Sequence, residues 1–332
     1  MNFPGTIYLL AILGPALATA LAVPFWRARC RRAGLVDDPG RRKIHETPMP
    51  LAGGLALMTG LLVALLGGAA AVLLAADQPF PPLDVLTLDR LRYGLGQRAP
   101  QLGAIFLGAL GMLGLGWWDD KHELRPAAKF TGQFLMAVLV AAAGVRITLF
   151  VESRCFSYAV TVLWILTVTN AFNFMDNMNG LCAGLGVIGA ACFAAAAAVQ
   201  GQYLVAIIAL ATTGALLGFL PYNFPRASVF LGDAGSHLTG YLLAVLAILP
   251  HFYSQKNPRA LAVLTPLLAL AVPLADLAWV VVLRWRAGQP FYVGDTNHLS
   301  HRLVRRGLGQ TQAVGVIWAV AAALAGLALW WN

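Results

Sequence analysis

AGGLALMTGLLVALLGGAAAVLLAA, residues 52–76, is a run of 25 residues without a charged side chain. A helix needs about 20 apolar residues to cross the hydrocarbon core of a bilayer, so this run predicts a membrane-spanning helix. Nine further apolar runs lie at 5–25, 101–118, 127–145, 156–173, 181–199, 203–221, 236–252, 261–283 and 312–330. We therefore predict an all-α, polytopic membrane protein of about ten transmembrane helices, with a single domain over residues 1–332.

The composition of the whole chain favours the same class. Hydrophobic residues make up 59% of the 332 residues, charged residues only 11%, and the mean hydropathy is +0.72. Soluble domains carry about 25% charged residues, so this chain has too little polar surface to face water on all sides. We expect membrane lipids around it and no nucleic-acid partner, because its basic residues lie in short loops between apolar runs.

The basic residues are divided unequally between the two sets of loops. Of the 23 lysines and arginines, 16 lie in the set that includes residues 26–51 and 284–311, and seven in the set that includes 77–100. Basic loops favour the cytoplasm. We therefore predict a multi-pass protein of the plasma (inner) membrane with both termini on the non-cytoplasmic side.

Most of the acidic residues follow the basic ones to the predicted cytoplasmic face. Nine of the 14 acidic residues lie in segments at this face: Asp37, Asp38, Glu46, Asp119, Asp120, Glu123, Asp176, Asp233 and Asp295. Crowded carboxylates repel one another unless a divalent cation or Lys and Arg partners join them. The pattern indicates a metal-dependent phosphoryl-transfer site at this face.

The segment GWWDDKHE at 116–123 ends the third predicted span and carries adjacent aspartates. Asp119 and Glu123 would share a helix face if the helix continued. Such carboxylates suit Mg²⁺, and the alternative is a polar helix end with ordinary ion pairs. Lys129, which opens the next run, would either snorkel to the interface or face the same site.

The segment NAFNFMDNMNG at 170–180 interrupts an apolar pattern with four asparagines and an aspartate. Asn170, Asn173 and Asn177 would form one helical stripe, with Asp176 three residues after Asn173. Polar groups at membrane depth favour a site, and the alternative is hydrogen bonding between helices.

Two further segments complete the set. FLGDAGS at 230–236 places Asp233 between glycines, with Ser236 as a predicted helix cap, although a plain tight turn would give the same pattern. DTNHLSHR at 295–302 suits diphosphate binding, or is a solvated loop. The isolated Asp276 is either functional or paired with Arg284.

Taken in order, these segments resemble the polyprenyl-phosphate N-acetylhexosamine-1-phosphate transferase family, in particular its N-acetylglucosamine-1-phosphate branch. The resemblance covers residues 34–310. The DDxxD motif of the family falls on 119–123, NAxNxxDGxDGL on 170–181, FxGDxGS on 230–236, HxHH on 298–301 and RKxHxxPxPxxGG on 42–54. The chain departs from these motifs at Glu123, Asn177, Asn179 and Ser300, which bears on the identity of the substrate more than on the chemistry.

The resemblance implies transfer of a sugar 1-phosphate from a UDP-sugar donor to a polyprenyl phosphate acceptor such as undecaprenyl phosphate. This reaction releases UMP and starts a cell-envelope glycan, with the active site on the cytoplasmic face and Mg²⁺, or Mn²⁺ as the alternative ion, as cofactor. A homodimer is left open. The alternatives are a Mg²⁺-dependent intramembrane prenyltransferase and a transporter with an intramembrane cation site.

The resemblance also assigns roles to residues. Asp233 is the expected chief metal ligand, with Asp176 as a second ligand or a covalent nucleophile. Asp119 and Asp120 are expected to orient the acceptor phosphate or to assist the metal. The expected substrate-binding residues are Lys43, His45, Lys129, Asn170, Asn173, Asn179, His298, His301 and Arg302, the last three for the donor diphosphate.

Overall fold

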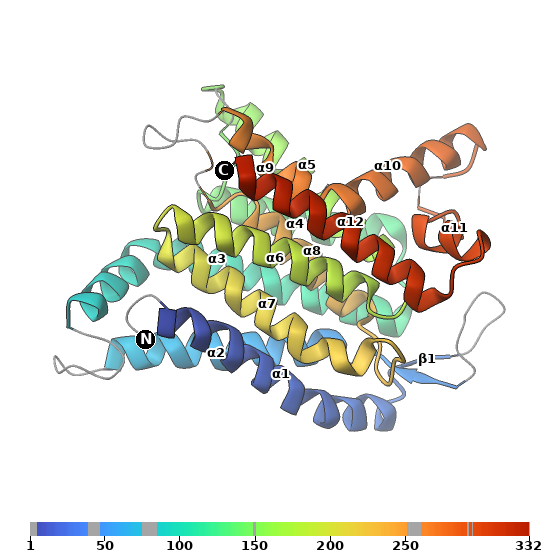
Figure 1. Cartoon of the computed structure of the whole chain (residues 1–332), viewed down its shortest axis with the longest axis horizontal. Coiled ribbons are helices and arrows are strands. Elements are labelled where there is room, and N and C mark those ends of the chain that lie inside the picture. The colour runs from blue at the N-terminus through green and yellow to red at the C-terminus, as the bar shows by residue number, and fades with distance from the viewer. Residues whose placement is uncertain are drawn as a thin grey trace.

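The computed structural model describes residues 5–38, 47–74, 85–148, 151–250, 252, 260–290, 292–293 and 295–331. Its helices are α1 (Gly5–Arg32), α2 (Gly53–Leu74), α3 (Val85–His122), α4 (Pro126–Ala142), α5 (Arg154–Met175), α6 (Leu181–Val199), α7 (Tyr203–Asn223), α8 (Gly232–Leu246), α9 (Thr265–Ala269), α10 (Ala271–Arg286), α11 (Leu299–Arg305) and α12 (Gln310–Trp331), with a 3₁₀ turn η1 (Ala260–Leu264). These helices pack into a bundle (Figure 1). The all-α prediction is confirmed.

Each predicted apolar run corresponds to helical structure. Seven helices in the described ranges are long and apolar enough to cross a membrane, which supports a polytopic membrane protein. An eighth span arises if Leu261–Ala269, which comprises most of η1 and all of α9, is counted together with α10, from which it is bent by 69°. Two helices in these runs, α4 with 17 residues and α8 with 15, are shorter than a usual span. The count of ten therefore stays a prediction.

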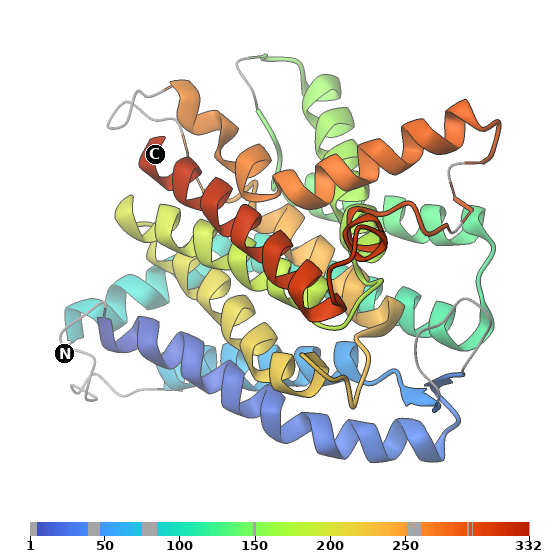
Figure 2. The ribbon, with the colours of Figure 1, turned by 45° about the vertical axis from the view of Figure 1, so that its right-hand side comes forward.

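The bend between α9 and α10 has a local cause in Pro273. Proline has no N–H with which to bond the carbonyl four residues earlier, and its ring clashes with that carbonyl. The backbone leaves helical geometry at Leu270, whose φ is −109° and ψ is 17°. In Figure 2, α10 runs out of the bundle toward the upper right of the view.

Small residues let α1 and α7 pack closely. A Cβ added to Gly214 would lie 2.1 Å from the Ile12 carbonyl oxygen, and one added to Gly218 would lie 2.1 Å from the Ala16 carbonyl oxygen. This spacing of small residues four apart is a common device for close helix contact in membranes. We call this contact the α1–α7 seam.

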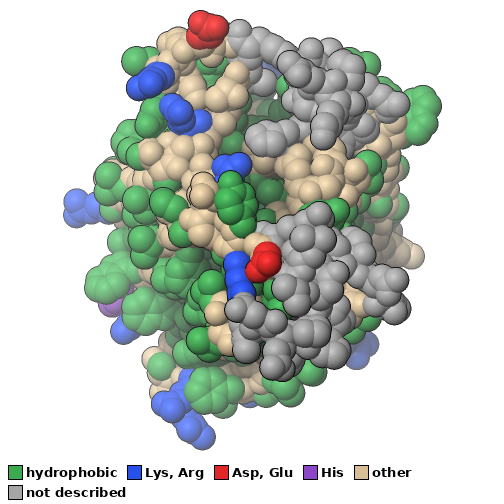
Figure 3. Space-filling view, turned by 90° about the vertical axis from the view of Figure 1, so that its left-hand side faces the viewer, with side chains coloured by type: hydrophobic (Ala, Val, Ile, Leu, Met, Phe, Trp, Pro, Cys, Tyr) green, Lys and Arg blue, Asp and Glu red, His purple; other side chains and the backbone are tan. Residues whose placement is uncertain are grey.

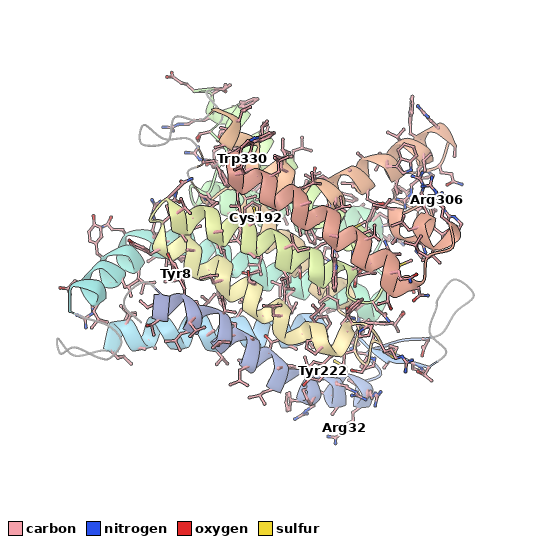
Figure 4. All side chains as sticks on the ribbon, in the orientation of Figure 1. Tyr8, Arg32, Cys192, Tyr222, Arg306 and Trp330 are labelled. Atoms are coloured by element: carbon pink, nitrogen blue, oxygen red, sulfur yellow. The ribbon has the colours of Figure 1, made fainter. Side chains whose placement is uncertain are left out.

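Helices of alternating direction bring one set of ends together on the right of Figure 1, where β1 (Val36–Asp37) pairs with β2 (Met49–Pro50). Arg32 and Arg306 lie at this end in Figure 4, and Tyr8 and Trp330 lie toward the other. Both termini are on the left in Figure 1, in agreement with an even number of crossings.

The two ends differ in the charge that they show. Figure 3 looks onto the left-hand end of Figure 1, where the described side chains are mainly hydrophobic with scattered Lys and Arg and few carboxylates. The helix ends that carry the acidic motifs lie on the opposite side and surround a cavity.

Candidate active site

A cavity of about 1230 Å³ opens between the helix ends on the right of Figure 1. It lies where α3, α5 and α7 end and where α8 and α12 begin. Its described walls are strongly acidic. Eight carboxylic residues line it: Asp37, Asp38, Asp119, Asp120, Glu123, Asp176, Asp233 and Asp295. We call it the carboxylate-lined cavity.

Lys129 joins two of these carboxylates. Its Nζ lies 2.6 Å from Asp119 Oδ2 and 2.7 Å from Asp233 Oδ2. The lysine side chain is only 17% exposed, so it faces the site and does not snorkel to the interface. An ammonium between two carboxylates offsets part of their repulsion.

Asparagines of α5 hold the other side of this cluster. Asn173 Nδ2 donates to Asp233 Oδ1 at 2.7 Å and to Ser236 Oγ at 3.0 Å. Asn170 Nδ2 donates to Gln133 Oε1 at 2.7 Å and to its own helix at Leu166 O. Asn173 therefore contacts the acidic cluster directly, whereas Asn170 bridges α5 to α4 below it.

The first turn of α8 is capped by carboxylates from other helices. Asp120 Oδ1 accepts from Asp233 N at 2.7 Å and Oδ2 accepts from Ala234 N at 3.1 Å. The Gly232 N–H donates a hydrogen bond to the Asp176 carboxylate. Free N–H groups at a helix start attract anions. Ser236, which the sequence predicted as the cap, instead lies inside the helix, so that prediction is wrong.

The cap requires close packing between α3 and α8, which Gly116 provides. A Cβ at Gly116 would lie 2.3 Å from the Asp233 carbonyl oxygen and 2.5 Å from Ala234 N. On the other side of the same turn, a Cβ at Gly54 would lie 2.5 Å from Gly235 N. Glycine is therefore required at both positions, because a methyl group would collide with backbone.

The strand segments attach to the same turn. Gly53 N donates to Phe230 O at 3.0 Å, Gly54 N donates to Leu231 O at 3.2 Å, and Phe230 N donates to Pro50 O at 3.0 Å. The prolines and glycines at 47–54 thus form a structured loop. Lys43 and His45, predicted to bind substrate, lie outside the described residues.

Two predicted helical faces are interrupted because α3 and α5 end earlier than the sequence suggests. Helix α3 ends at His122, and Glu123 has a φ of 48°, so Asp119 and Glu123 do not share a helical face. Asp119 Oδ1 accepts from Leu124 N at 2.7 Å. Helix α5 ends at Met175, which leaves Asn177 in the following turn and limits the polar stripe to Asn170 and Asn173.

The loop after α10 is held by an ion pair and by a contact between an aspartate and a histidine. Arg284 Nε lies 2.7 Å from Asp295 Oδ2, and Asp276 Oδ2 lies 2.7 Å from His298 Nδ1. The predicted alternative of an Asp276–Arg284 pair is therefore wrong. Attraction to Arg284 and the bond from the Asn297 amide hold the pKa of Asp295 below its usual range, against the effect of burial.

The donor-binding candidates take different positions around this loop. His301 lines the cavity, and burial lowers the pKa of its ring below the usual value. His298 is 6% exposed beside Asp276, and Arg302 stacks on Trp279 at 4.8 Å. Asn179 also lines the cavity.

The amino-acid sequence of this chain is similar to those of known proteins. A profile described as glycosyl transferase family 4 matches residues 102–251, which include the cluster around Lys129 and Asp233. A probable undecaprenyl-phosphate N-acetylglucosaminyl 1-phosphate transferase of Bacillus subtilis (strain 168) is 30% identical over 318 residues, 93% of this chain and 81% of the relative. The chain belongs to glycosyl transferase family 4.

Other members of glycosyl transferase family 4 are similar over the same extent. A decaprenyl-phosphate N-acetylglucosaminephosphotransferase of Mycobacterium tuberculosis (strain ATCC 25618 / H37Rv) is 32% identical over 93% of this chain and 79% of its own length. An undecaprenyl-phosphate alpha-N-acetylglucosaminyl 1-phosphate transferase of Escherichia coli (strain K12) is 26% identical over 94% and 80%. The likeness therefore covers nearly the whole chain.

This family member has polar site residues that the sequence did not single out. Gln133, one turn after Lys129, is fully buried and accepts from Asn170. Asp37 and Asp295, to which the sequence assigns no individual role, also line the cavity. The spacing of Gln133 from Lys129 was a usable signal, whereas the approach of Asp37 depends on the β1–β2 pairing.

Carboxylate oxygens are the ligands that a hard divalent ion prefers. Burial raises the pKa of Asp176 well above its usual range, and Asp233 and Asp120 raise it further. A cation beside them would relieve this repulsion. Within the described ranges, no group of three or more His, Cys, Asp or Glu side chains is arranged to hold a metal. Water and substrate oxygens would have to complete the shell, as is common for Mg²⁺.

Proposed function

We propose that this protein transfers an N-acetylhexosamine 1-phosphate from a UDP-sugar to a polyprenyl phosphate, releases UMP and so starts a cell-envelope glycan. The observation that supports it best is the Asp119–Lys129–Asp233 cluster at the mouth of a membrane bundle. The names of the relatives specify a polyprenyl phosphate and N-acetylglucosamine phosphate.

The position of the cavity suits two substrates of opposite character. A polyprenyl acceptor keeps its chain in the bilayer and its phosphate at the surface, whereas a nucleotide sugar arrives from water. The cavity lies at the helix ends, where both can meet. The acceptor phosphate has a second pKa near about 6, so it is largely deprotonated at neutral pH and needs no strong general base.

A divalent ion, Mg²⁺ or in its place Mn²⁺, would be held by Asp233 and Asp176 and would supply neutralisation of the charge that develops on the diphosphate. Lys129 holds Asp119 and Asp233 at fixed positions and offers a cation to a phosphate oxygen. Both oxygens of Asp120 are occupied by α8 amides, so we assign it to positioning Asp233. His301 is the loop histidine placed to contact the donor.

The reaction class predicts a specific product. Membranes that contain this protein, given undecaprenyl phosphate and a UDP-N-acetylhexosamine, are expected to form UMP and a lipid-linked sugar diphosphate in equal amounts. Product analysis of a panel of UDP-sugars, with the acceptor omitted as control, checks this result. Release of UDP would indicate ordinary glycosyl transfer. Release of inorganic pyrophosphate when a polyprenyl diphosphate replaces undecaprenyl phosphate would indicate the prenyltransferase alternative.

We also propose that the cavity faces the cytoplasm, because basic loops favour that side. Cys155 is exposed and the other three cysteines are buried, so Cys155→Ser gives a background of low reactivity. In that background, Glu152→Cys is expected to react with an impermeant maleimide in intact cells, whereas Arg306→Cys should react only after permeabilisation. The two variants introduce the same thiol at opposite ends of the helix bundle, so they differ only in the side of the membrane that they report. Labelling of both in intact cells would contradict the proposed orientation.

A further inference from the structure

Helix α11 forms part of the cavity wall although it has only seven residues. A helix of this length is not stable by itself. Its position therefore depends on contacts with neighbouring side chains. One attachment is Asp276, which is 4% exposed in α10. Its Oδ2 contacts His298 Nδ1 at 2.7 Å, and its Oδ1 accepts from Leu299 N, the first amide of α11, at 2.6 Å.

The second attachment is Asn177, in the turn after α5. Its Nδ2 donates to Phe174 O at 2.6 Å, which fixes the amide and turns Oδ1 toward α11. There Oδ1 accepts from Ser300 Oγ at 2.6 Å. Ser300 is fully buried and Asn177 lines the cavity. Both residues depart from the family motifs, and the structure shows that these two departures are bonded to each other.

Phe174 connects the two attachments. The Arg284 guanidinium lies 4.9 Å from the centre of its ring, and the His298 ring lies 5.6 Å from it in an edge-on arrangement. The end of α5, the end of α10 and the start of α11 therefore pack on one aromatic side chain. A shift of any of them would move the others.

We propose that Asp276 and the Asn177–Ser300 bond form a two-point latch that holds α11 in place, and that the latch positions His301 for binding of the donor diphosphate. This inference rests on the proposed function for the identity of the ligand. His301 follows Ser300 directly, so the bond that fixes Ser300 also fixes the direction of the histidine. Asp276 and Asn177 are positioning residues, because they act through α11.

The Asn177–Ser300 bond is tested by a double-mutant cycle. Ser300→Ala and Asn177→Ala are each expected to raise the donor KM about threefold to tenfold, which is what one buried hydrogen bond contributes. The acceptor KM and kcat should change less than the donor KM. Both changes break the bond between Asn177 and Ser300, and Asn177→Ala also loses the bond to Phe174 O. The double variant should therefore be no worse than Asn177→Ala alone.

The matched control is Ser157→Ala, which removes another buried serine hydroxyl, bonded to Ile147 O at 2.7 Å, at the opposite end of α5. It is expected to leave the donor KM unchanged. Asp276→Ala removes both acceptor oxygens. It should therefore raise the donor KM more than Asp276→Asn, which keeps one oxygen for the Leu299 amide. If Asp276→Ala does not fold, Ser300→Ala still decides the matter.

Hydrogen exchange of the backbone amides of 299–305 gives a readout that does not need substrate. Exchange should accelerate in Ser300→Ala and not in Ser157→Ala, even if the wild-type protein released no UMP and the proposed function were wrong. Unchanged exchange would overturn the latch. Faster exchange with an unchanged donor KM would overturn the positioning role, as would strictly additive effects in the cycle.

Discussion

Asp233→Asn is expected to lower turnover by about 100-fold or more, in line with the loss of one preorganised charge at a reacting centre. The substitution keeps the shape of the side chain and the bond from Asn173, but it removes the charge that faces Lys129. It also removes the carboxylate proposed to hold the metal. We expect the protein to remain folded, because Lys129 keeps its second carboxylate partner, Asp119.

The measurement is UMP release across a range of Mg²⁺ concentrations, together with a melting curve in detergent. Asp89→Asn is the matched control, since Asp89 is 63% exposed and pairs with Arg92 away from the cavity. Asp89→Asn should change neither the rate of UMP release nor the melting temperature. If Asp233→Asn keeps near full activity at limiting Mg²⁺, the metal site must be rebuilt around Asp119, Asp120 and Asp176.

Gly116→Ala is expected to disable the enzyme by a different route. The new methyl group would overlap the backbone of Asp233 and Ala234, and this backbone is fixed by the Asp120 cap. Helices α3 and α8 would have to separate. Overpacking of this kind costs about 1–3 kcal/mol, and a displacement of about 1 Å at a reacting group lowers the rate by about 100-fold.

Gly114→Ala is the control for that variant, two residues earlier in the same helix. A Cβ at Gly114 meets no atom within 4 Å, and alanine is preferred over glycine in a helix by about 0.5–1 kcal/mol. The control should be as active as the wild-type protein and at least as stable. Equal activity of the two variants would show that the contact between α3 and α8 does not set the site.

The sequence predicted the helices well, because an apolar run in a membrane protein has few alternatives. It also predicted which helix ends carry the site, since loop charges and carboxylates follow alternating spans. The core of the site, Asp119, Asp120, Lys129, Asn173, Asp176 and Asp233, is brought together as expected. Their motifs are short and local, so they could be recognised one at a time.

Pairings between distant segments could not be predicted. Asp276 and Arg284 are eight residues apart, so a mutual pair was reasonable, yet each finds its partner in the loop beyond α10. Ser236 was the obvious local cap, but Asp120 arrives from another helix with two oxygens and satisfies both amides. Such choices depend on tertiary packing, which the local pattern does not contain.

The α1–α7 seam bears on how the protein is made. Ile12 leaves the ribosome about 200 residues before Gly214, the residue whose missing side chain makes room for it. At about 5–20 residues per second, the first helix waits about 10–40 s in the membrane for its partner. During this interval the backbone of α1 at Ile12 and Ala16 has no seventh helix to pack on. Assembly of the bundle is therefore completed late in synthesis, and a chain truncated before α7 would leave α1 without this contact.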